Sequence, residues 1–157
     1  RRQRQMCIID RFKLIVDKYK IPTRLIELEL TETAVLDNIE GLLDTMNNLK
    51  EKGFVISMDD FGTGYSSLNL LKELPVDILK LDRAFFTEKD ESNNEKIVIS
   101  NVIKMAKELK MKVISEGVET ISQVEFLKQI GCDMVQGYLF SKPMPVKEFE
   151  KIAFKKE

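Results

Sequence analysis

Residues 54–67, FVISMDDFGTGYSS, constrain this chain more than any other stretch, because a short apolar run leads straight into two adjacent aspartates. The run is typical of a buried β-strand, and the loop after it carries two glycines and a serine pair suited to cap the next helix. Adjacent carboxylates at the end of a buried strand repel each other and lose hydration, and a bound cation relieves both effects. The stretch therefore favours a cation-binding loop over the alternative, a solvated Asp-Asp turn.

Helical and strand patterns alternate along the rest of the chain. Apolar spacing predicts helices over residues 12–21, 39–52, 67–74, 97–109, 121–131 and 146–154, and Thr120 with Gln123 forms a capping-box pattern before the fifth. Short apolar runs predict strands over residues 25–30, 54–58, 77–81, 112–115 and 133–136, and residues 87–96 predict a polar connection. Five strands that alternate with helices indicate a parallel α/β fold.

Each predicted strand has a mostly aliphatic face and a second face with a polar residue near its C-terminal end. These polar residues are Glu29, Asp59, Lys80, Glu116 and Gln136. In an open doubly wound sheet, helices cover both faces and would bury these groups without purpose. In a barrel the second face points inward, and active sites lie at its C-terminal rim. The sequence therefore predicts a TIM-type barrel, and unrelated surface ion pairs are the competing interpretation.

The acidic residues at this rim predict a metal site. Glu29, Asp59, Asp60 and Glu116 supply the hard oxygen ligands that Mg²⁺ or Mn²⁺ prefers. A carboxylate that bridges two such ions is typical of attack by water on a phosphodiester, and Asp59 or Asp60 is placed to bridge. Lys80 offers a fixed positive charge, a role compatible with a plain salt bridge, and Glu116 is a candidate base. The residues alone predict metal-assisted phosphoester hydrolysis and leave the substrate open.

The composition narrows the chemistry. The 157 residues include no histidine, which excludes histidine bases and imidazole metal ligands. Cys7 and Cys132 form neither a disulfide framework nor a metal-ligand spacing, so a cytoplasmic location is expected. The net charge is −1 and no apolar run reaches the ~20 residues of a membrane span. We therefore expect no duplex nucleic acid partner, and no membrane contact in this segment.

Five short motifs stand out: ELTE at 29–32, DDFGTGYSS at 59–67, KLD at 80–82, EGVE at 116–119 and QGY at 136–138. In this order and spacing they resemble the motifs of EAL domains, bacterial signalling phosphodiesterases that linearise cyclic di-GMP to pGpG. The resemblance runs from about residue 11 to the C-terminus and implies a TIM-type barrel with one strand reversed. It also implies cyclic di-GMP as the partner of the site and a homodimer in the intact protein. An upstream sensor or GGDEF domain is compatible with it.

The resemblance assigns roles residue by residue. The residues that match the family's ligands for two Mg²⁺ or Mn²⁺ ions are Glu29, Asp59, Asp60 and Glu116, with Asp59 bridging. Lys80 and Glu116 resemble the catalytic pair that positions and deprotonates the attacking water. The residues that resemble substrate-binding or loop-stabilising positions are Glu32, Phe61, Gly62, Glu119 and Gln136.

Two parts of the family pattern are missing from the chain: the tripeptide Glu-Ala-Leu and the asparagine after the third barrel strand, both ligand positions. The five predicted strands match the last five of eight, so we expect residues 11–157 to form an incomplete barrel, the C-terminal part of an EAL domain. Residues 1–10 lack periodicity and are not expected to be genuine domain sequence. We expect the parent protein to be a cyclic di-GMP phosphodiesterase, and this chain alone to be inactive or nearly so.

Two other hypotheses are weighed against this one. The parent could be a degenerate EAL domain that binds the dinucleotide without cleaving it, although the intact acidic set and Lys80 argue against that. A receiver-like phosphorylation switch also has five parallel strands, an aspartate pair and a lysine. There the aspartates should follow the first strand and the lysine the last, whereas here they follow the second and occupy the third.

Overall fold

The computed structural model describes residues 11–31, 39–62, 68–86 and 93–154, apart from the side chains of residues 40 and 68–70. The expectations for residues 1–10, for Glu32 and for the loop at residues 63–67 therefore fall outside the described residues. None of the described helices is long and apolar enough to cross a membrane.

Five parallel strands form one sheet in sequential order. They are β1 (Glu27–Thr31), β2 (Val55–Phe61), β3 (Ile78–Leu81), β4 (Lys112–Ser115) and β5 (Met134–Val135). β1 and β5 are the edge strands of this sheet. A receiver-like sheet would place the second strand outside the first, so the observed order contradicts that alternative.

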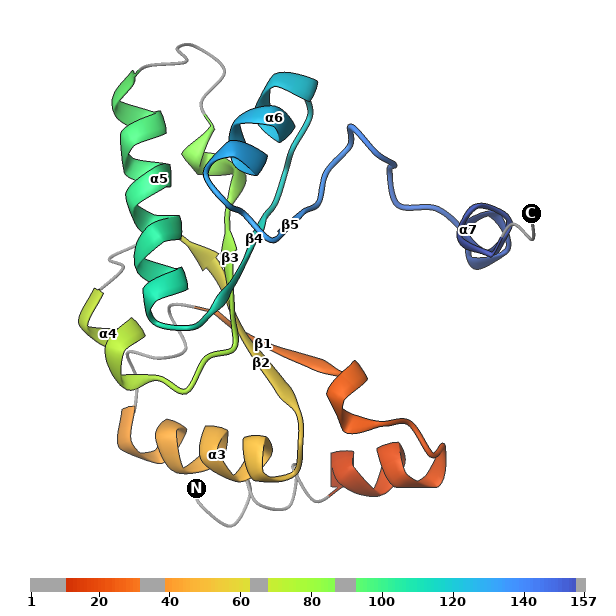
Figure 1. Ribbon diagram of the computed structural model, residues 1–157. Helices are drawn as coiled ribbons and strands as arrows, with labels where there is room; N and C mark the ends of the chain where they lie inside the picture. Colours follow the sequence, from red (N-terminus) through yellow and green to blue (C-terminus); the bar gives the residue numbers. More distant parts are fainter. Residues whose placement is uncertain (1–10, 32–38, 63–67, 87–92, 155–157) are drawn as a thin grey trace.

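Helices pack along one side of this sheet (Figure 1). They are α3 (Ile39–Glu51), α4 (Leu68–Glu73), α5 (Asn93–Glu108) and α6 (Ile121–Gln129), with short 3-10 turns η1 (Thr23–Leu25) and η2 (Arg83–Phe85). The core lies between helices and sheet, where Met46, Leu71, Ile103 and Leu127 pack with Met58, Leu79 and Val113. These strand residues share one face, so the opposite face is left for the polar residues. The arrangement is an arc of an α/β barrel, as predicted.

Several element bounds differ from the sequence prediction, and those of α5, β2 and β5 are described here. α5 begins at Asn93, so the predicted polar connection at 87–96 is wrong for residues 93–96. The first turn of a helix tolerates polar side chains, and the apolar spacing that reveals the helix starts only at Ile97. β2 extends to Phe61, beyond the predicted 54–58, and β5 is reduced to two residues. The predicted capping box of α6 is present, with Thr120 and Gln123 bonded reciprocally.

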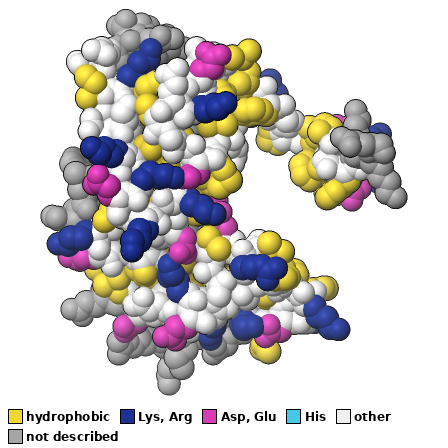
Figure 2. Space-filling model, viewed as in Figure 1, with side chains coloured by type: hydrophobic (Ala, Val, Ile, Leu, Met, Phe, Trp, Pro, Cys, Tyr) yellow, Lys and Arg dark blue, Asp and Glu magenta, His cyan; other side chains and the backbone are white. Residues whose placement is uncertain are grey.

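The last helix, α7 (Val146–Ala153), stands away from the sheet at the end of an extended connection (Figure 1). Its apolar side chains Val146, Phe149 and Ile152 are exposed, and Figure 2 shows hydrophobic surface on this helix facing the hollow between it and the body. An exposed apolar stripe on a helix is normally buried against another element. Among the described elements, α7 is the only helix or strand after β5.

Candidate active site

Lys80 lies at the centre of three carboxylates that come from three other strands or their ends. Its Nζ is 2.7 Å from Glu29 Oε1, 2.9 Å from Asp59 Oδ1 and 2.8 Å from Glu116 Oε1. The Lys80 side chain is only 9% exposed, whereas that of Glu29 is 50% exposed, so the ammonium lies beneath carboxylates that reach solvent. The ammonium thus donates a hydrogen bond to Glu29 Oε1 and lies within ion-pair distance of the Asp59 and Glu116 carboxylates. The structure brings four of the predicted site residues together.

The surroundings of Lys80 keep its ammonium charged. Burial disfavours the charged form and by itself would lower the pKa, but the contacts with Glu116, Glu29 and Asp59 outweigh burial. The net effect raises the pKa of Lys80 above its ordinary value. Lys80 is therefore suited to hold a water molecule or an anionic oxygen by its charge, and unsuited to accept a proton.

Asp59 and Asp60 lie at a bulge in β2. Met58 pairs with Leu79 and Phe61 pairs with Leu81, so β2 carries one more residue than β3 between these pairs. Asp60 adopts the left-handed conformation, with φ of 55°. The bulge reverses the alternation of side chains. Asp59 lies in the polar cluster by plain alternation, and the extra residue in β2 returns Phe61 to the hydrophobic core.

Backbone hydrogen bonds hold Glu116 and Gln136 at the ends of their strands. Glu116 N–H donates to Leu81 O at 2.9 Å, which continues the ladder between β3 and β4. Gln136 N–H donates to Ser115 O at 2.8 Å, and its own carbonyl accepts from Val118 N–H at 3.0 Å. A Cβ on Gly137 would lie 2.0 Å from Val118 O, so only glycine permits this close approach of the two loops. Both side chains are therefore fixed to the same rim.

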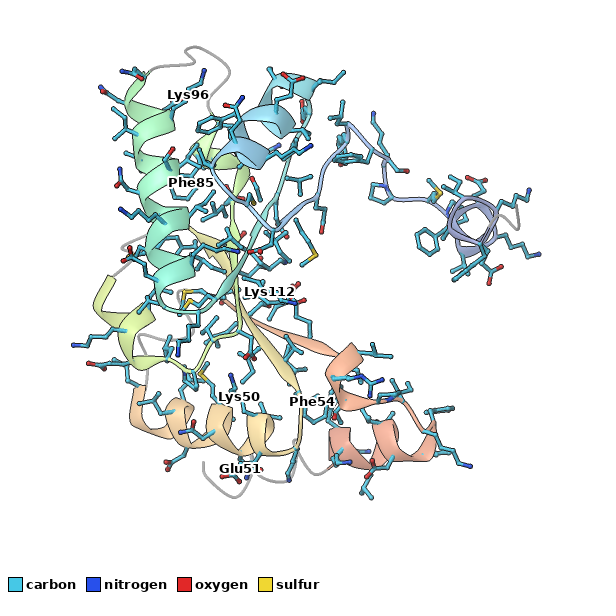
Figure 3. The ribbon with its side chains drawn as sticks, in the orientation of Figure 1. Lys50, Glu51, Phe54, Phe85, Lys96 and Lys112 are labelled. Carbon is cyan, nitrogen blue, oxygen red and sulfur yellow. The ribbon has the colours of Figure 1, made fainter. Side chains whose placement is uncertain are left out.

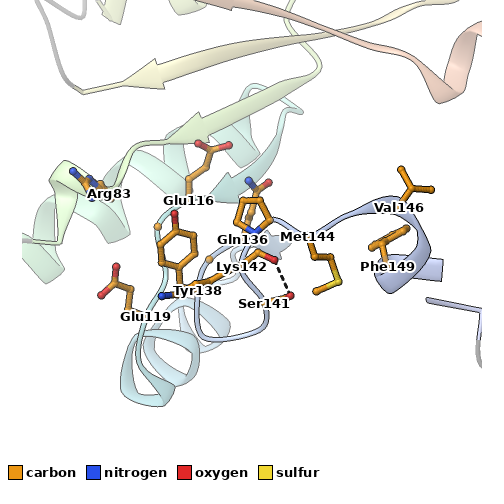
Figure 4. A pocket seen from close by; sticks show the side chains of 13 residues that line it. Arg83, Glu116, Glu119, Gln136, Tyr138, Ser141, Lys142, Met144, Val146 and Phe149 are labelled. Carbon is orange, nitrogen blue, oxygen red and sulfur yellow. Dashed lines mark hydrogen bonds between the residues drawn. The ribbon is translucent and has the colours of Figure 1, made fainter. Parts of the chain in front are cut away.

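A pocket of about 550 Å³ opens beside the lysine cluster, between the ends of β4 and β5 and the connection to α7 (Figure 4). Its polar lining includes Glu116, Gln136, Arg83 and Glu119, and Tyr138 stands among them. The pocket shares Glu116 with the cluster around Lys80. A ligand in the pocket would therefore meet both an aromatic ring and the charged cluster.

The remaining predicted site residues lie in different surroundings. Phe61 is buried in the core, and Gly62 follows it so close to the Phe85 ring that a Cβ would lie 2.2 Å from that ring (Figure 3 labels Phe85). Phe61 and Gly62 are therefore held by the core and by the Phe85 ring at the end of β2. Glu119 lines the pocket, and its backbone N–H donates to Gln123 Oε1 at 2.9 Å. Asp60 is exposed.

Two pocket residues were not singled out as functional from the sequence. Arg83 directly follows the Lys80 motif on η2, and Tyr138 closes the motif that begins with Gln136. The sequence signal that could have indicated both residues is their position just after a residue at the rim, because loops at the C-terminal ends of barrel strands line the site. The side-chain alternation alone could not reveal either residue, since both lie beyond their strands.

The EAL domain family model matches residues 2–143 of the chain. The chain belongs to the EAL domain family. Cyclic di-GMP phosphodiesterase NbdA of Pseudomonas aeruginosa is 40% identical to it over 144 residues, which are 92% of this chain and 18% of NbdA. The chain thus spans about a fifth of the length of the curated relatives it matches.

Solved EAL structures share the fold. The phosphodiesterase PaMucR in complex with c-di-GMP superposes with a TM-score of 0.82 at 35% identity, over 90% of this chain and 57% of that one. BlrP1 of Klebsiella pneumoniae, solved with manganese and cyclic di-GMP, has a TM-score of 0.77 at 28% identity, over 85% of this chain and 35% of that one. These likenesses support the incomplete TIM-type barrel inferred from the sheet.

The cluster of this EAL chain offers a donor set that fits a hard divalent cation. Glu29, Asp59 and Glu116 supply carboxylate oxygens, and Asp59 Oδ1 is buried with an ion pair to Lys80 but no aligned hydrogen bond. Among the described residues, no group of three or more acidic side chains is arranged to hold a metal ion. They surround the Lys80 ammonium instead, so a cation at this site would share the carboxylates with Lys80.

Proposed function

We propose that this chain is the C-terminal part of a metal-dependent phosphodiesterase that hydrolyses cyclic di-GMP to the linear dinucleotide pGpG in bacterial signalling. The observation that carries the proposal is the convergence of Glu29, Asp59 and Glu116 on Lys80 at the rim of the barrel arc. The names of NbdA and of the PaMucR complex supply the substrate, which the geometry alone does not identify.

Glu29, Asp59, Asp60 and Glu116 would hold two Mg²⁺ or Mn²⁺ ions, which when bound neutralise the phosphodiester and lower the pKa of water. Lys80 stays cationic and orients the attacking water or a phosphate oxygen. Glu116, 2.8 Å from Lys80 Nζ, is placed to accept the proton of that water as its oxygen attacks phosphorus. The bond from phosphorus to the ribose 3′ oxygen breaks, this oxygen takes up a proton from solvent, and the product is the linear dinucleotide with a 5′-phosphate.

The pocket beside the cluster is suited to the rest of the dinucleotide. Tyr138 offers an aromatic face, and Arg83 offers a cationic group for phosphate or for a base edge. The Gln136 amide can both donate and accept hydrogen bonds. We propose that this pocket orients cyclic di-GMP so that one phosphodiester reaches the carboxylates. Glu32 and Glu119 are proposed to hold the loop after Asp60.

The proposal is tested with a chimeric domain in which the barrel is complete. The missing N-terminal units are taken from the EAL domain of PaMucR and joined to residues 11–157 of this chain, and cyclic di-GMP is supplied with Mn²⁺. Formation of pGpG that is lost in the Lys80→Met and Glu116→Gln variants supports the proposal. Hydrolysis that survives both substitutions contradicts it. The 157-residue chain, assayed in parallel, should show little or no turnover.

A second candidate is a module that binds cyclic di-GMP without cleaving it. The observation that favours it is that Lys80 engages all three carboxylates. Among the described residues, no group of three or more acidic side chains is then arranged to hold a metal ion. The chimeric domain distinguishes the two, because binding without pGpG formation at saturating Mn²⁺ would support the binding module.

We also propose a cytoplasmic location and a homodimer for the intact protein. The described part of the chain holds one cysteine, Cys132, as a free thiol, which suits a reducing compartment. The dimer is proposed from the family resemblance, and sedimentation of the chimeric domain at several concentrations tests it.

A further inference from the structure

We propose that Ser57 is a positioning residue for Lys80: its small side chain leaves the space through which the lysine crosses β2 to reach Glu29. The inference deepens the proposed function and rests on it only for the catalytic consequence. The geometric part of the inference concerns only the cluster of Lys80 with its carboxylates, without metal or substrate.

The ion pair between Lys80 and Glu29 spans three strands. Lys80 lies on β3 and Glu29 on β1, and β2 runs between them. Neighbouring strands are about 4.8 Å apart, so the two backbones are separated by about 10 Å. Since Lys80 Nζ comes within 2.7 Å of Glu29 Oε1, one or both side chains lie across the inner face of β2.

The register shows what lies beneath this ion pair. Glu29 pairs with Ser57, and Lys80 lies beside the bulge that contains Asp59. Ser57 and Asp59 are two residues apart, so their side chains share the inner face. The path from Lys80 to Glu29 therefore runs diagonally over β2, with Asp59 on one side and Ser57 below the far end.

Ser57 is fully buried, at 0% exposed, and its Oγ has no hydrogen-bond partner among the described residues. An unpaired buried hydroxyl destabilises a fold, so hydrogen bonding does not explain this side chain. Its size does explain it, because a β-branched or longer side chain at this position would occupy the space that the Lys80 side chain uses. We expect such a residue to force Lys80 away from Glu29 first, since Glu29 lies on the farther strand.

A second serine provides a matched control. Ser115 on β4 is also 0% exposed, and its Oγ also lacks a hydrogen-bond partner among the described residues. Ser115 alternates with Glu116, so its side chain points to the helix-packed face and away from the cluster. Ser57→Val and Ser115→Val therefore make the same change at equal burial on opposite faces of the sheet.

The experiment follows the ammonium of Lys80 directly in the metal-free chain. Hydrogens of a buried, ion-paired lysine exchange slowly with water, so its ¹⁵N–¹H signal is observable, and the Lys80→Met variant assigns it. We expect Ser57→Val to accelerate exchange at least about tenfold, whereas Ser115→Val and Ser57→Ala leave it within about twofold. If Ser57→Val fails to fold, Ser57→Thr, which adds a single methyl group, is measured in its place.

Slow exchange that persists in the folded Ser57→Val variant would overturn the proposal, and so would acceleration of the same size in Ser57→Ala, because alanine leaves the space intact. The result does not depend on hydrolysis, so it separates this inference from the proposed function. If both hold, Ser57→Val in the chimeric phosphodiesterase should lower kcat at least about tenfold with KM changed less than about threefold.

Discussion

Asp133 repeats at the start of β5 the contacts that Asp77 makes at the start of β3. Asp77 Oδ2 accepts from Ile56 N–H at 3.0 Å, and Asp133 Oδ2 accepts from Val113 N–H at 2.8 Å, in each case at the second residue of the neighbouring strand. Each aspartate also receives a lysine from the helix before that strand, Lys50 on α3 or Lys107 on α5. Figure 3 shows Lys50 at the end of α3 nearest the sheet. We call this arrangement, one aspartate held by a strand N–H and by a helix lysine, a clamp. The same clamp thus joins two helix–strand units at the end of the barrel opposite the site.

The clamps should stabilise the fold without taking part in the chemistry. Replacing Asp77 or Asp133 by Asn weakens a charge-assisted hydrogen bond to a strand N–H and removes an ion pair. We expect each substitution to lower the free energy of unfolding by about 1 kcal/mol, measured by urea denaturation. Asp17→Asn, which removes only the exposed pair with Lys13, serves as the control and should cost less than about 0.5 kcal/mol.

The Asp133 clamp should depend on pH. Burial alone would raise the pKa of Asp133, but the hydrogen bonds from Lys107 and Val113 N–H outweigh burial and hold it below its ordinary value of 3.8. The stabilisation is therefore complete above the unfolded-state pKa and is lost as the pH falls through the depressed one. The stability gap between the wild type and Asp133→Asn should be full at neutral pH and shrink in acid. A gap that stays constant down to about pH 2 would refute this reading.

The contacts of these clamps could not be predicted from the sequence, whereas features set by local structure could. Strand alternation is a local, rigid property of the backbone, so Glu29, Lys80 and Glu116 could be assigned to the inner face from the sequence. The capping box of Thr120 is equally local. The partners of Asp77 and Asp133 lie 20 to 27 residues away, and no local pattern pairs them.

The bulge at Asp60 gives a prediction about the site. Asn tolerates the left-handed conformation of Asp60, whereas a β-branched residue does not. Asp60→Val should therefore be less stable than Asp60→Asn by about 1–2 kcal/mol in urea denaturation. Both variants lose the carboxylate, so both should bind Mn²⁺ more weakly than the wild type in the chimeric domain. Equal stability of the two variants would mean that the bulge does not persist in solution.

Gly62 and Gly131 form a matched pair for the anchor of the active-site loop. Both have positive φ, but a Cβ at Gly62 would collide with the Phe85 ring, whereas one at Gly131 would meet nothing within 4 Å. We expect Gly62→Ala to cost at least about 1 kcal/mol more than Gly131→Ala in thermal or urea unfolding. Adding Phe85→Leu to Gly62→Ala should recover part of that difference. Equal losses in the two alanine variants would exclude the ring contact as the cause.

The bulge and the ring contact could not be predicted, for physical reasons. The extra residue in β2 is defined only by its pairing with β3, so the strand pattern of residues 54–58 ends before it becomes visible. The residue type at position 60 does not indicate a positive φ, because aspartate is common in ordinary turns. Alternation puts Ser57 on the same face as Asp59, but its relation to Lys80 depends on a salt bridge that crosses a strand.

The central claim is that Glu29, Asp59 and Glu116 form one cation site with Lys80. Crystals of the chimeric domain grown with Mn²⁺ test it by anomalous scattering at the manganese absorption edge. We expect an anomalous peak about 2 Å from an Asp59 carboxylate oxygen, and its loss in Asp59→Asn. Ordered Glu29, Asp59 and Glu116 side chains at saturating Mn²⁺, with no peak in contact with any of them, would contradict it.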